Sequence, residues 1–217
     1  MMKSKPGQTD ELRVGRITAL IHRAVARPRV YDAVQTAGGA AYTDMRVRKA
    51  IARSVTLAPG MTVIDVGGGT GRSRLLWPSN VRYVLIDNDH EKIAGFEAKR
   101  VEGEAVYADA KALPFADATV DVAMLSAVIH HLPPGVPEVA LGEIQRVLKP
   151  DGRLILHDAV WRRWRPVGRV MWRFDRGSYP RGKAEITAIV DAHFKILSFE
   201  EYSIFHRYVL LAARPRP

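Results

Sequence analysis

The chain has no cysteine among its 217 residues. Without thiols it cannot build a disulfide scaffold, a zinc–thiolate site, an iron–sulfur cluster or a cysteine nucleophile. Long apolar runs are scarce too, because the longest nearly apolar stretch, residues 122–129, is far shorter than the roughly 18 residues of a membrane span. The first residues lack the apolar segment of a secretion signal, so the sequence predicts a cytoplasmic protein.

Positive charge dominates the two ends of the chain. Residues 1–60 hold 11 Lys and Arg against 4 Asp and Glu, residues 61–158 hold 10 against 14, and residues 159–217 hold 12 against 5, which together give the net charge of +10. Basic ends favour an anionic partner, and three kinds stay open: a phosphate-bearing small molecule, a membrane surface and nucleic acid. The alternative is that these basic residues bind no partner and only keep the protein soluble.

From residue 61 onward, short apolar runs alternate with helical stretches. The runs cover residues 61–66, 81–86, 104–107, 120–125 and 153–157, and the helical stretches cover 72–76, 91–99 and 136–148. This alternation predicts a parallel sheet with helices on both faces. Two further runs, at 194–200 and 208–213, have no helix between them, so we expect them to form an antiparallel hairpin at the sheet edge.

Residues 63–71, with the sequence VIDVGGGTG, carry the strongest chemical signal. They lie between a predicted strand and a predicted helix, where glycines let the backbone approach a ligand and a helix start offers free amides. A nicotinamide-dinucleotide site would place its third glycine where Arg72 stands, and a P-loop would need a lysine there. The motif therefore disfavours both of these common sites.

Three acidic residues end three predicted strands. Asp65 ends the first, Asp87 comes 22 residues later at the end of the second, and Asp109 ends the third. The carboxyl ends of parallel strands meet at one edge of the sheet, where ligands bind and where a carboxylate accepts hydrogen bonds from ribose hydroxyls. We therefore expect these acids to hold one ligand together. A helix cap or a solvated loop is the alternative for each acid alone.

Four sequence features together resemble the class I S-adenosylmethionine-dependent methyltransferases, and within them the type 11 group of small-molecule and lipid methyltransferases. The features are DVGGGTG, the strand end at Asp87, ADAKALPFADATVDVAMLSAVIHHLP and VLKPDGRLILHD, within about residues 57–158. The resemblance implies an α/β, doubly wound, Rossmann-like fold with a seven-stranded, mostly parallel sheet and an antiparallel C-terminal hairpin. It also implies S-adenosyl-L-methionine as the cofactor and no metal.

The resemblance further implies which residues bind the cofactor. The methionine part would be lined by Asp65, Gly67, Gly69 and Gly71, the ribose held by Asp87, the adenine addressed by Asn88, Asp109 and Ala110, and the underside of the cofactor supported by Ser126.

The residues directly after the fourth predicted strand constrain the chemistry at the acceptor. They read SAVIHH, not the Asn/Asp-Pro-Pro-Tyr/Phe run of adenine amino-methylases, and they lack the two glutamates of protein arginine methyltransferases. His131 matches the histidine of phosphoethanolamine-type methyltransferases, which pairs with a tyrosine from the N-terminal helices; Tyr31 or Tyr42 could be that partner here. A histidine can act as a general base near neutral pH. The alternative is that His131 only packs beneath the cofactor.

The resemblance also divides the chain into two parts. Residues 1–60, with helices expected near 11–26 and 43–55, would form a helical substrate cap, and residues 61–217 the methyltransferase domain. A basic lid is predicted at 161–183, where five arginines between 162 and 176 form one stripe of a helix. A basic helix with tryptophans can lie in a membrane interface, so a peripheral membrane contact through 161–176 stays open beside a solvated helix face.

The sequence thus predicts methyl transfer to an O, N or C atom of a small anionic or amphiphilic acceptor. An RNA-modifying methyltransferase and a non-catalytic cofactor-binding module are the alternatives. Nucleic acid is disfavoured as a partner, because the arginines of the predicted lid alternate with large apolar residues.

Overall fold

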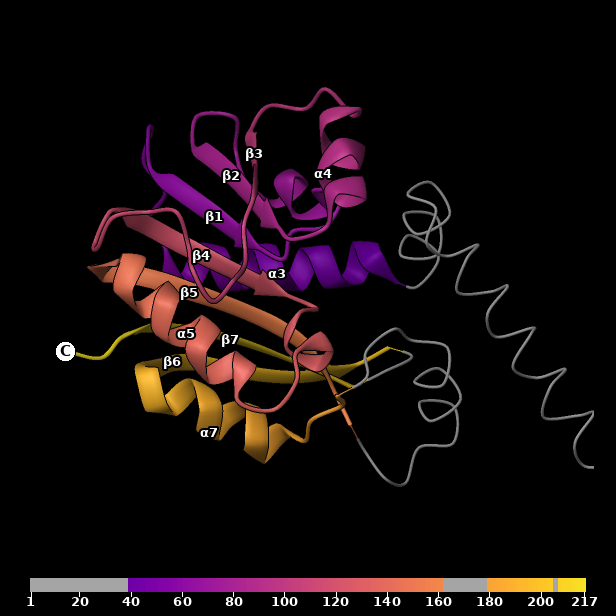
Figure 1. The fold of residues 1–217 in the computed structure, drawn as a ribbon. Coiled ribbons are helices and arrows are strands. Elements are labelled where there is room, and N and C mark those ends of the chain that lie inside the picture. The colour runs from indigo at the N-terminus through magenta and orange to yellow at the C-terminus, as the bar shows by residue number, and fades with distance from the viewer. Residues whose placement is uncertain (1–38, 162–178, 205–206) are drawn as a thin grey trace, which may run out of the picture.

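Seven strands form a single sheet in the computed structural model, which describes residues 39–161, 179–204 and 207–217. The strand order is β3-β2-β1-β4-β5-β7-β6 (Figure 1). The strands are β1 (Thr62–Val66), β2 (Arg82–Asp87), β3 (Glu104–Tyr107), β4 (Val120–Ser126), β5 (Leu148–Val160), β6 (Phe194–Ser203) and β7 (Arg207–Pro215). Strand β7 runs antiparallel to β5 and β6, and the remaining pairs are parallel. The predicted mostly parallel sheet with an antiparallel C-terminal hairpin is confirmed.

Helices cover both faces of this sheet, as predicted. In Figure 1, α5 and α7 lie on one face and α3 on the other. The helical elements are α3 (Ala40–Ser54), η1 (Arg72–Leu76), α4 (His90–Glu97), η2 (Ile129–His131), α5 (Val136–Val147) and α7 (Lys183–His193). Helix α7 was not predicted, although Ile186, Ile189 and Val190 have helical spacing and are buried.

The two helical layers explain why the central strands are almost continuously apolar. In β1, Ile64 and Val66 join the buried cluster that includes residues of α5 and α7, whereas Val63 joins the cluster that includes residues of α3 and α4. Because side chains alternate along a strand, Asp65 points to the same face as Val63. A carboxylate thus enters a layer that is mainly apolar.

Helix α3 is the described part of the predicted N-terminal cap. Its inner residues Val47 and Ile51 are buried in the same cluster as Val63, which confirms the helix expected near residues 43–55. The helix expected near 11–26 and the arginine stripe from 162 to 176 lie outside the described residues. No helix in the described ranges is long and apolar enough to cross a membrane.

Candidate active site

The glycine motif forms a loop at the carboxyl end of β1. Gly67, Gly69 and Gly71 all have positive φ, at 69°, 60° and 75°. A Cβ atom at Gly67 would lie 2.6 Å from Val128 and one at Gly71 would lie 2.0 Å from Phe96, so packing requires glycine at both. At Gly69 the nearest atom is 3.9 Å away on the flexible side chain of Lys92. The loop therefore leaves open space at Gly69, where a ligand could approach the backbone.

Asp65 lies directly beneath this loop and is only 1% exposed. Its Oδ2 accepts a hydrogen bond of 2.5 Å from the Tyr83 hydroxyl of β2. Its Oδ1 is buried without a hydrogen-bond partner among the residues that the structure describes. Burial raises the pKa of Asp65 to about 6, against the opposing effects of the hydrogen bond from Tyr83 and of the Ser73 side chain.

Asp87 joins the glycine loop to the next strand end. Its Oδ2 accepts a hydrogen bond of 2.9 Å from the amide of Gly69, and its Oδ1 accepts one of 3.0 Å from the amide of Asp89. Lys92 of α4 lies 3.9 Å from the same carboxylate. Each carboxylate oxygen can accept more than one hydrogen bond, so two ribose hydroxyls could still donate to Asp87.

The predicted adenine side is more exposed. Asn88 and Asp109 are exposed, and Ala110 is half-buried against the core. The Asp109 carboxylate accepts a hydrogen bond of 2.9 Å from the amide of Lys111 and lies 3.3 Å from its ammonium group.

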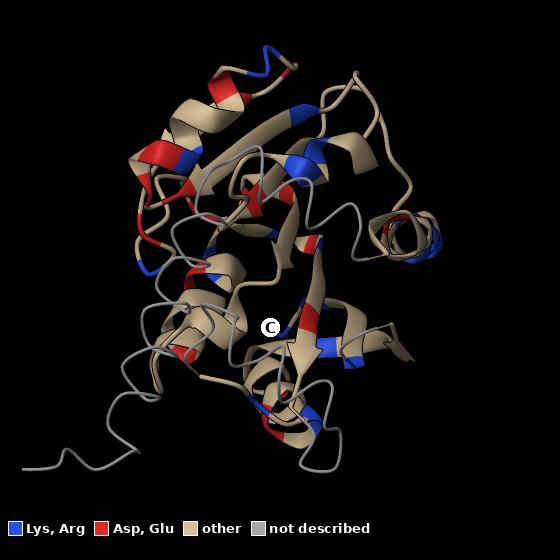
Figure 2. Cartoon of the chain, turned by 90° about the vertical axis from the view of Figure 1, so that its right-hand side faces the viewer, with Lys and Arg blue, Asp and Glu red and all other residues tan. Residues whose placement is uncertain are grey.

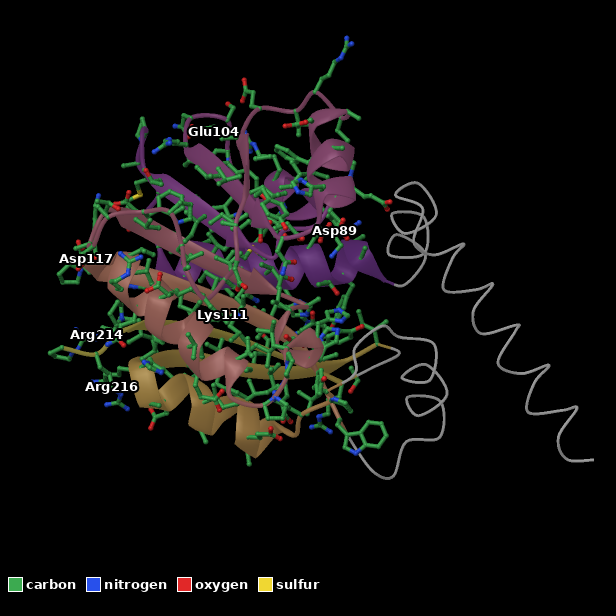
Figure 3. All side chains as sticks on the ribbon, in the orientation of Figure 1. Asp89, Glu104, Lys111, Asp117, Arg214 and Arg216 are labelled. Atoms are coloured by element: carbon green, nitrogen blue, oxygen red, sulfur yellow. The ribbon has the colours of Figure 1, made fainter. Side chains whose placement is uncertain are left out.

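A stacked pair of rings at this edge was not predicted. The rings of His90 and Tyr107 lie parallel with their centroids 3.9 Å apart. Tyr107 is the register partner of Asp87, which places the stack beside the predicted ribose site. Figure 3 shows Asp89, next to this stack in the chain, at the opposite end of the sheet from Asp117 and Arg214.

Ser126 ends β4 and begins a hydrogen-bonded chain of side chains. Its Oγ lies 3.3 Å from Nδ1 of His157, whose Nε2 lies 2.7 Å from the Tyr202 hydroxyl. Tyr202 in turn donates to Thr43 of α3 at 3.3 Å. Burial lowers the pKa of His157 to about 4 and raises that of Tyr202 to about 12, so both side chains are neutral at pH 7. The sequence did not reveal this chain, whose members come from four elements.

The loop after β4 is held by a buried acid. Asp158 of β5 is fully buried, and its Oδ1 lies 2.5 Å from Nδ1 of His130. Its Oδ2 accepts from the amides of Val128 and Ile129, at 3.2 and 2.7 Å. Arg181 adds a second buried charge and donates to the carbonyl of Ile129 at 2.6 Å. Neither role was predicted.

The two candidate catalytic residues lie in different clusters of side chains. His131 is exposed at the end of η2, and its ring centroid lies 4.1 Å from that of His130. Tyr42 of α3 meets the ring of Tyr202 edge-on at 5.9 Å and lies beneath the guanidinium of Arg46. Tyr31 lies outside the described residues.

These residues fit an adenosyl amino acid. The open space at Gly69 allows a close approach, and Asp87 offers acceptors for ribose hydroxyls. The unpaired oxygen of Asp65 suits a positively charged group such as an α-ammonium. Across the described ranges, no group of three or more His, Asp or Glu side chains is placed to hold a metal ion.

Comparison with known proteins agrees with this geometry. Residues 64–156 match the family described as "Methyltransferase domain". An uncharacterized methyltransferase of Mycobacterium sp. (strain KMS) is 36% identical over 111 residues, which are 51% of this chain and 43% of that protein. A demethylmenaquinone methyltransferase of Renibacterium salmoninarum is 31% identical over 112 residues, which are 51% of this chain and 46% of that protein. The chain thus spans less than half the length of these relatives.

Two solved structures share the fold. The PH0226 protein from Pyrococcus horikoshii OT3 has a TM-score of 0.66 at 19% identity, over 81% of this chain and 91% of that chain. Geranyl diphosphate C-methyltransferase from Streptomyces coelicolor A3(2), solved with S-adenosyl-L-homocysteine, has a TM-score of 0.65 at 14% identity, over 79% of this chain and 76% of that chain. Residues 64–156 therefore match a methyltransferase domain and the fold is that of these solved structures, and the comparisons support S-adenosylmethionine as the cofactor.

Proposed function

We propose that this chain transfers a methyl group from S-adenosylmethionine to an O, N or C atom of a small anionic or amphiphilic acceptor. The observation that carries the proposal is the arrangement of Asp65, Gly69 and Asp87 at one edge of the sheet. When bound, S-adenosylmethionine supplies an electrophilic methyl group on a sulfonium. The protein then has mainly to align the acceptor with that group, because methyl transfer is an in-line displacement.

The chain's own residues would divide this work. Gly67, Gly69 and Gly71 let the loop approach the methionine part, and Asp87 orients the ribose. Ser126, fixed by His157, supports the cofactor from below. Where the acceptor must lose a proton, a ring nitrogen of His131 would accept it, since this ring is exposed beside the buried pair of His130 and Asp158.

The amphiphilic acceptor is supported by two relatives and by charge. One relative is named for demethylmenaquinone and one structural neighbour for geranyl diphosphate, both of which combine an apolar part with a polar one. Helix α3 adds the exposed cations Arg48, Lys49 and Arg53. Figure 2 views this helix nearly along its axis and shows blue on its outer side. We extend the proposal to peripheral contact with an anionic membrane, through these cations and the predicted lid.

The first test uses two matched glycine variants. Gly69→Ala places a side chain in the open space of the loop, whereas Gly60→Ala, at a φ of 80° with no atom within 4 Å of its Cβ, imposes similar backbone strain away from the site. We expect Gly69→Ala to abolish binding of S-adenosylhomocysteine and Gly60→Ala to preserve it, measured by calorimetry. Equal affinities in the two variants would contradict the proposed cofactor site.

The second test identifies the acceptor. The protein is incubated with methyl-labelled S-adenosylmethionine and, in separate reactions, a cellular lipid extract, an aqueous metabolite extract and total RNA. We expect label in the lipid or anionic metabolite fraction, and none with Gly69→Ala. Label in RNA would contradict the proposed acceptor class, and cofactor binding without any transfer would favour a non-catalytic module.

A further inference from the structure

A buried arginine contacts the loop that carries His131. Arg181 lies two residues before α7 and is only 4% exposed. One of its terminal nitrogens, Nη1, donates to the carbonyl of Ile129 at 2.6 Å, and the other, Nη2, donates to the carbonyl of Leu132 at 2.9 Å. The guanidinium group therefore bridges the backbone on both sides of His131.

The backbone around Arg181 adds to this contact. The amide of Tyr179 donates to the carbonyl of His130 at 3.1 Å. Nη1 of Arg181 also donates to the carbonyl of Tyr179 at 3.3 Å, and the carbonyl of Arg181 accepts from the amide of Trp161, directly after β5, at 2.8 Å. Residues 179–181 thus connect the end of β5 to the carbonyl side of η2.

Arg181 and Asp158 hold different ends of the loop. Asp158 contacts its start, where Oδ2 accepts from the amide of Val128 at 3.2 Å. Val128 packs against the glycine loop, since a Cβ atom at Gly67 would lie 2.6 Å from its side chain. Arg181 contacts carbonyls on both sides of His131, further along the loop. We therefore expect Asp158 to support the cofactor side of the loop and Arg181 to support the end that carries His131.

The geometry uses a property that lysine lacks. A guanidinium group is a planar fork whose two terminal nitrogens can reach two carbonyls at once, whereas the ammonium group of lysine is a compact point charge. Nε of Arg181 lies 3.1 Å from the carboxylate of Glu185, whose side chain is 56% exposed. A buried ion is weak evidence for stability, because an apolar side chain of similar volume often stabilises a fold equally well. The fork therefore suits a role in fixing the loop geometry.

We propose that Arg181 is the positioning residue for His131: by bridging the carbonyls of Ile129 and Leu132, it fixes the direction in which the His131 ring meets the acceptor. The inference rests on the proposed function, in which His131 accepts the proton that the acceptor loses. Arg181 itself forms and breaks no covalent bond and exchanges no proton in this role.

A double-mutant cycle tests whether Arg181 acts through His131. Label from methyl-labelled S-adenosylmethionine is followed into a cellular lipid extract and an aqueous metabolite extract, with the wild type, Arg181→Lys, His131→Ala and the double variant. We expect His131→Ala to lower the transfer rate by about 100-fold, as for a lost general base. Arg181→Lys should lower it by about tenfold or more, because a small misplacement of a reacting group is enough for such a loss.

The double variant gives the decisive comparison. It should be no slower than His131→Ala alone, because removal of the ring leaves Arg181 nothing to position. An effect of Arg181→Lys that is equally large with and without His131 would overturn the inference, as would full transfer activity in His131→Ala. A wild type that transfers no label to either extract would instead contradict the proposed function.

Two controls separate positioning from charge and from cofactor binding. Glu185→Gln removes the ion pair of Arg181 but keeps both bridging hydrogen bonds, so it should transfer at the wild-type rate. Arg181→Lys should bind S-adenosylhomocysteine with wild-type affinity by calorimetry, because Asp158 still holds Val128 against the glycine loop. Loss of this binding would overturn the positioning role, since the cofactor site would then depend on Arg181.

The wild type itself tests the bridge if Arg181→Lys does not fold. In protein labelled with ¹⁵N-arginine, two terminal nitrogens held by separate carbonyls should slow the rotation of the Arg181 guanidinium group and give separate Nη1 and Nη2 signals. A single averaged signal, as for a freely rotating group, would overturn the inference. Arg181→Gln, which keeps one amide donor, then replaces Arg181→Lys in the cycle, with the same expected outcome.

Discussion

Asp65 and Asp158 lie near the carboxyl ends of two parallel strands, β1 and β5, and both are almost completely inaccessible to solvent. Burial is the largest influence on the pKa of each, but the outcomes are opposite. The pKa of Asp158 is lowered below its ordinary value, because His130 and the amide of Ile129 stabilise the charge. The pKa of Asp65 is raised to about 6, because Tyr83 and Ser73 offset only part of its burial.

The difference separates an acid that builds the protein from one that is suited to a ligand. Asp158 receives the hydrogen bonds it needs from the chain and uses them to fix the loop after β4. Asp65 receives too few, and it lies beneath the glycine loop with an unpaired oxygen. The carboxyl edge of the sheet thus carries one buried acid, Asp158, whose acceptors are satisfied by the chain, and another, Asp65, with an acceptor that is not.

The largest expected effect is a loss of stability when Asp158 is replaced. Asp158→Asn leaves His130 and three backbone amides facing a neutral amide, and breaking such a buried pair costs about 3 to 5 kcal/mol of unfolding free energy. Urea denaturation at pH 7 measures it. In the wild type, the ionised Asp158 carboxylate stabilises the folded state at pH values above the ordinary pKa of aspartate. This contribution is lost as the pH falls through the lowered pKa of Asp158. A loss below about 1 kcal/mol would mean that the cluster does not hold the loop.

The next effect is on ligand affinity. Asp87→Ala removes the acceptor for ribose hydroxyls and should weaken S-adenosylhomocysteine binding by about 1.5 to 3 kcal/mol, as for a lost hydrogen bond to a charged group. Calorimetry at pH 7.5 measures the change. A weakening of the same size in Asp117→Ala, an exposed acid at the opposite end of the sheet, would show that general electrostatics and not the site is responsible (Figure 3).

Asp65→Asn should act on stability in the opposite direction to Asp158→Asn. A pKa raised from 3.8 to about 6 means that the ionised carboxylate costs the folded state about 3 kcal/mol at neutral pH. Loss of the hydrogen bond from Tyr83 offsets part of the relief, so we expect a net gain of about 1 to 2 kcal/mol at pH 7.5. The gain should disappear below pH 5, where wild-type Asp65 keeps its proton when folded. A stability loss at pH 7.5 in urea titrations would contradict the unsatisfied state of this acid.

The smallest effect concerns the neutral chain from Ser126 to Thr43. Tyr202→Phe removes one hydroxyl that bonds to His157 and Thr43 and should lower the unfolding free energy by about 1 kcal/mol. Because the pKa of His157 is lowered to about 4, this loss should not vary between pH 6 and pH 8. Variation within that range would show that His157 titrates there.

The fold was largely predictable because its signals are local. Apolar runs that end in glycines or acids located the ends of β1 and β2, and parallel pairing brings Asp65 and Asp87 to one edge. The short helix at 72–76 was also predicted, and it is a 3₁₀ helix in the structure. Helix α7 was missed because the basic segment before it obscured the helical spacing of Ile186 and Val190.

The contacts within the site were less predictable because they depend on sheet register and long sequence separations. Tyr83 reads in the sequence as an ordinary strand residue, yet its hydroxyl decides the orientation of Asp65. Arg181 lies about 50 residues from the loop that it holds, and no motif marks it. The roles of His131 and Tyr42 stay predictions, since each ring meets neighbours of its own cluster.

The most direct test of the contrast is a carboxyl-carbon NMR titration of protein labelled with ¹³C-aspartate, with Asp65→Asn and Asp158→Asn to assign the two signals. In the free protein we expect the Asp65 signal to titrate near pH 6 and the Asp158 signal to titrate only below the ordinary pKa of aspartate. An Asp65 that is already fully ionised at pH 5, or that titrates together with Asp158, would contradict the account.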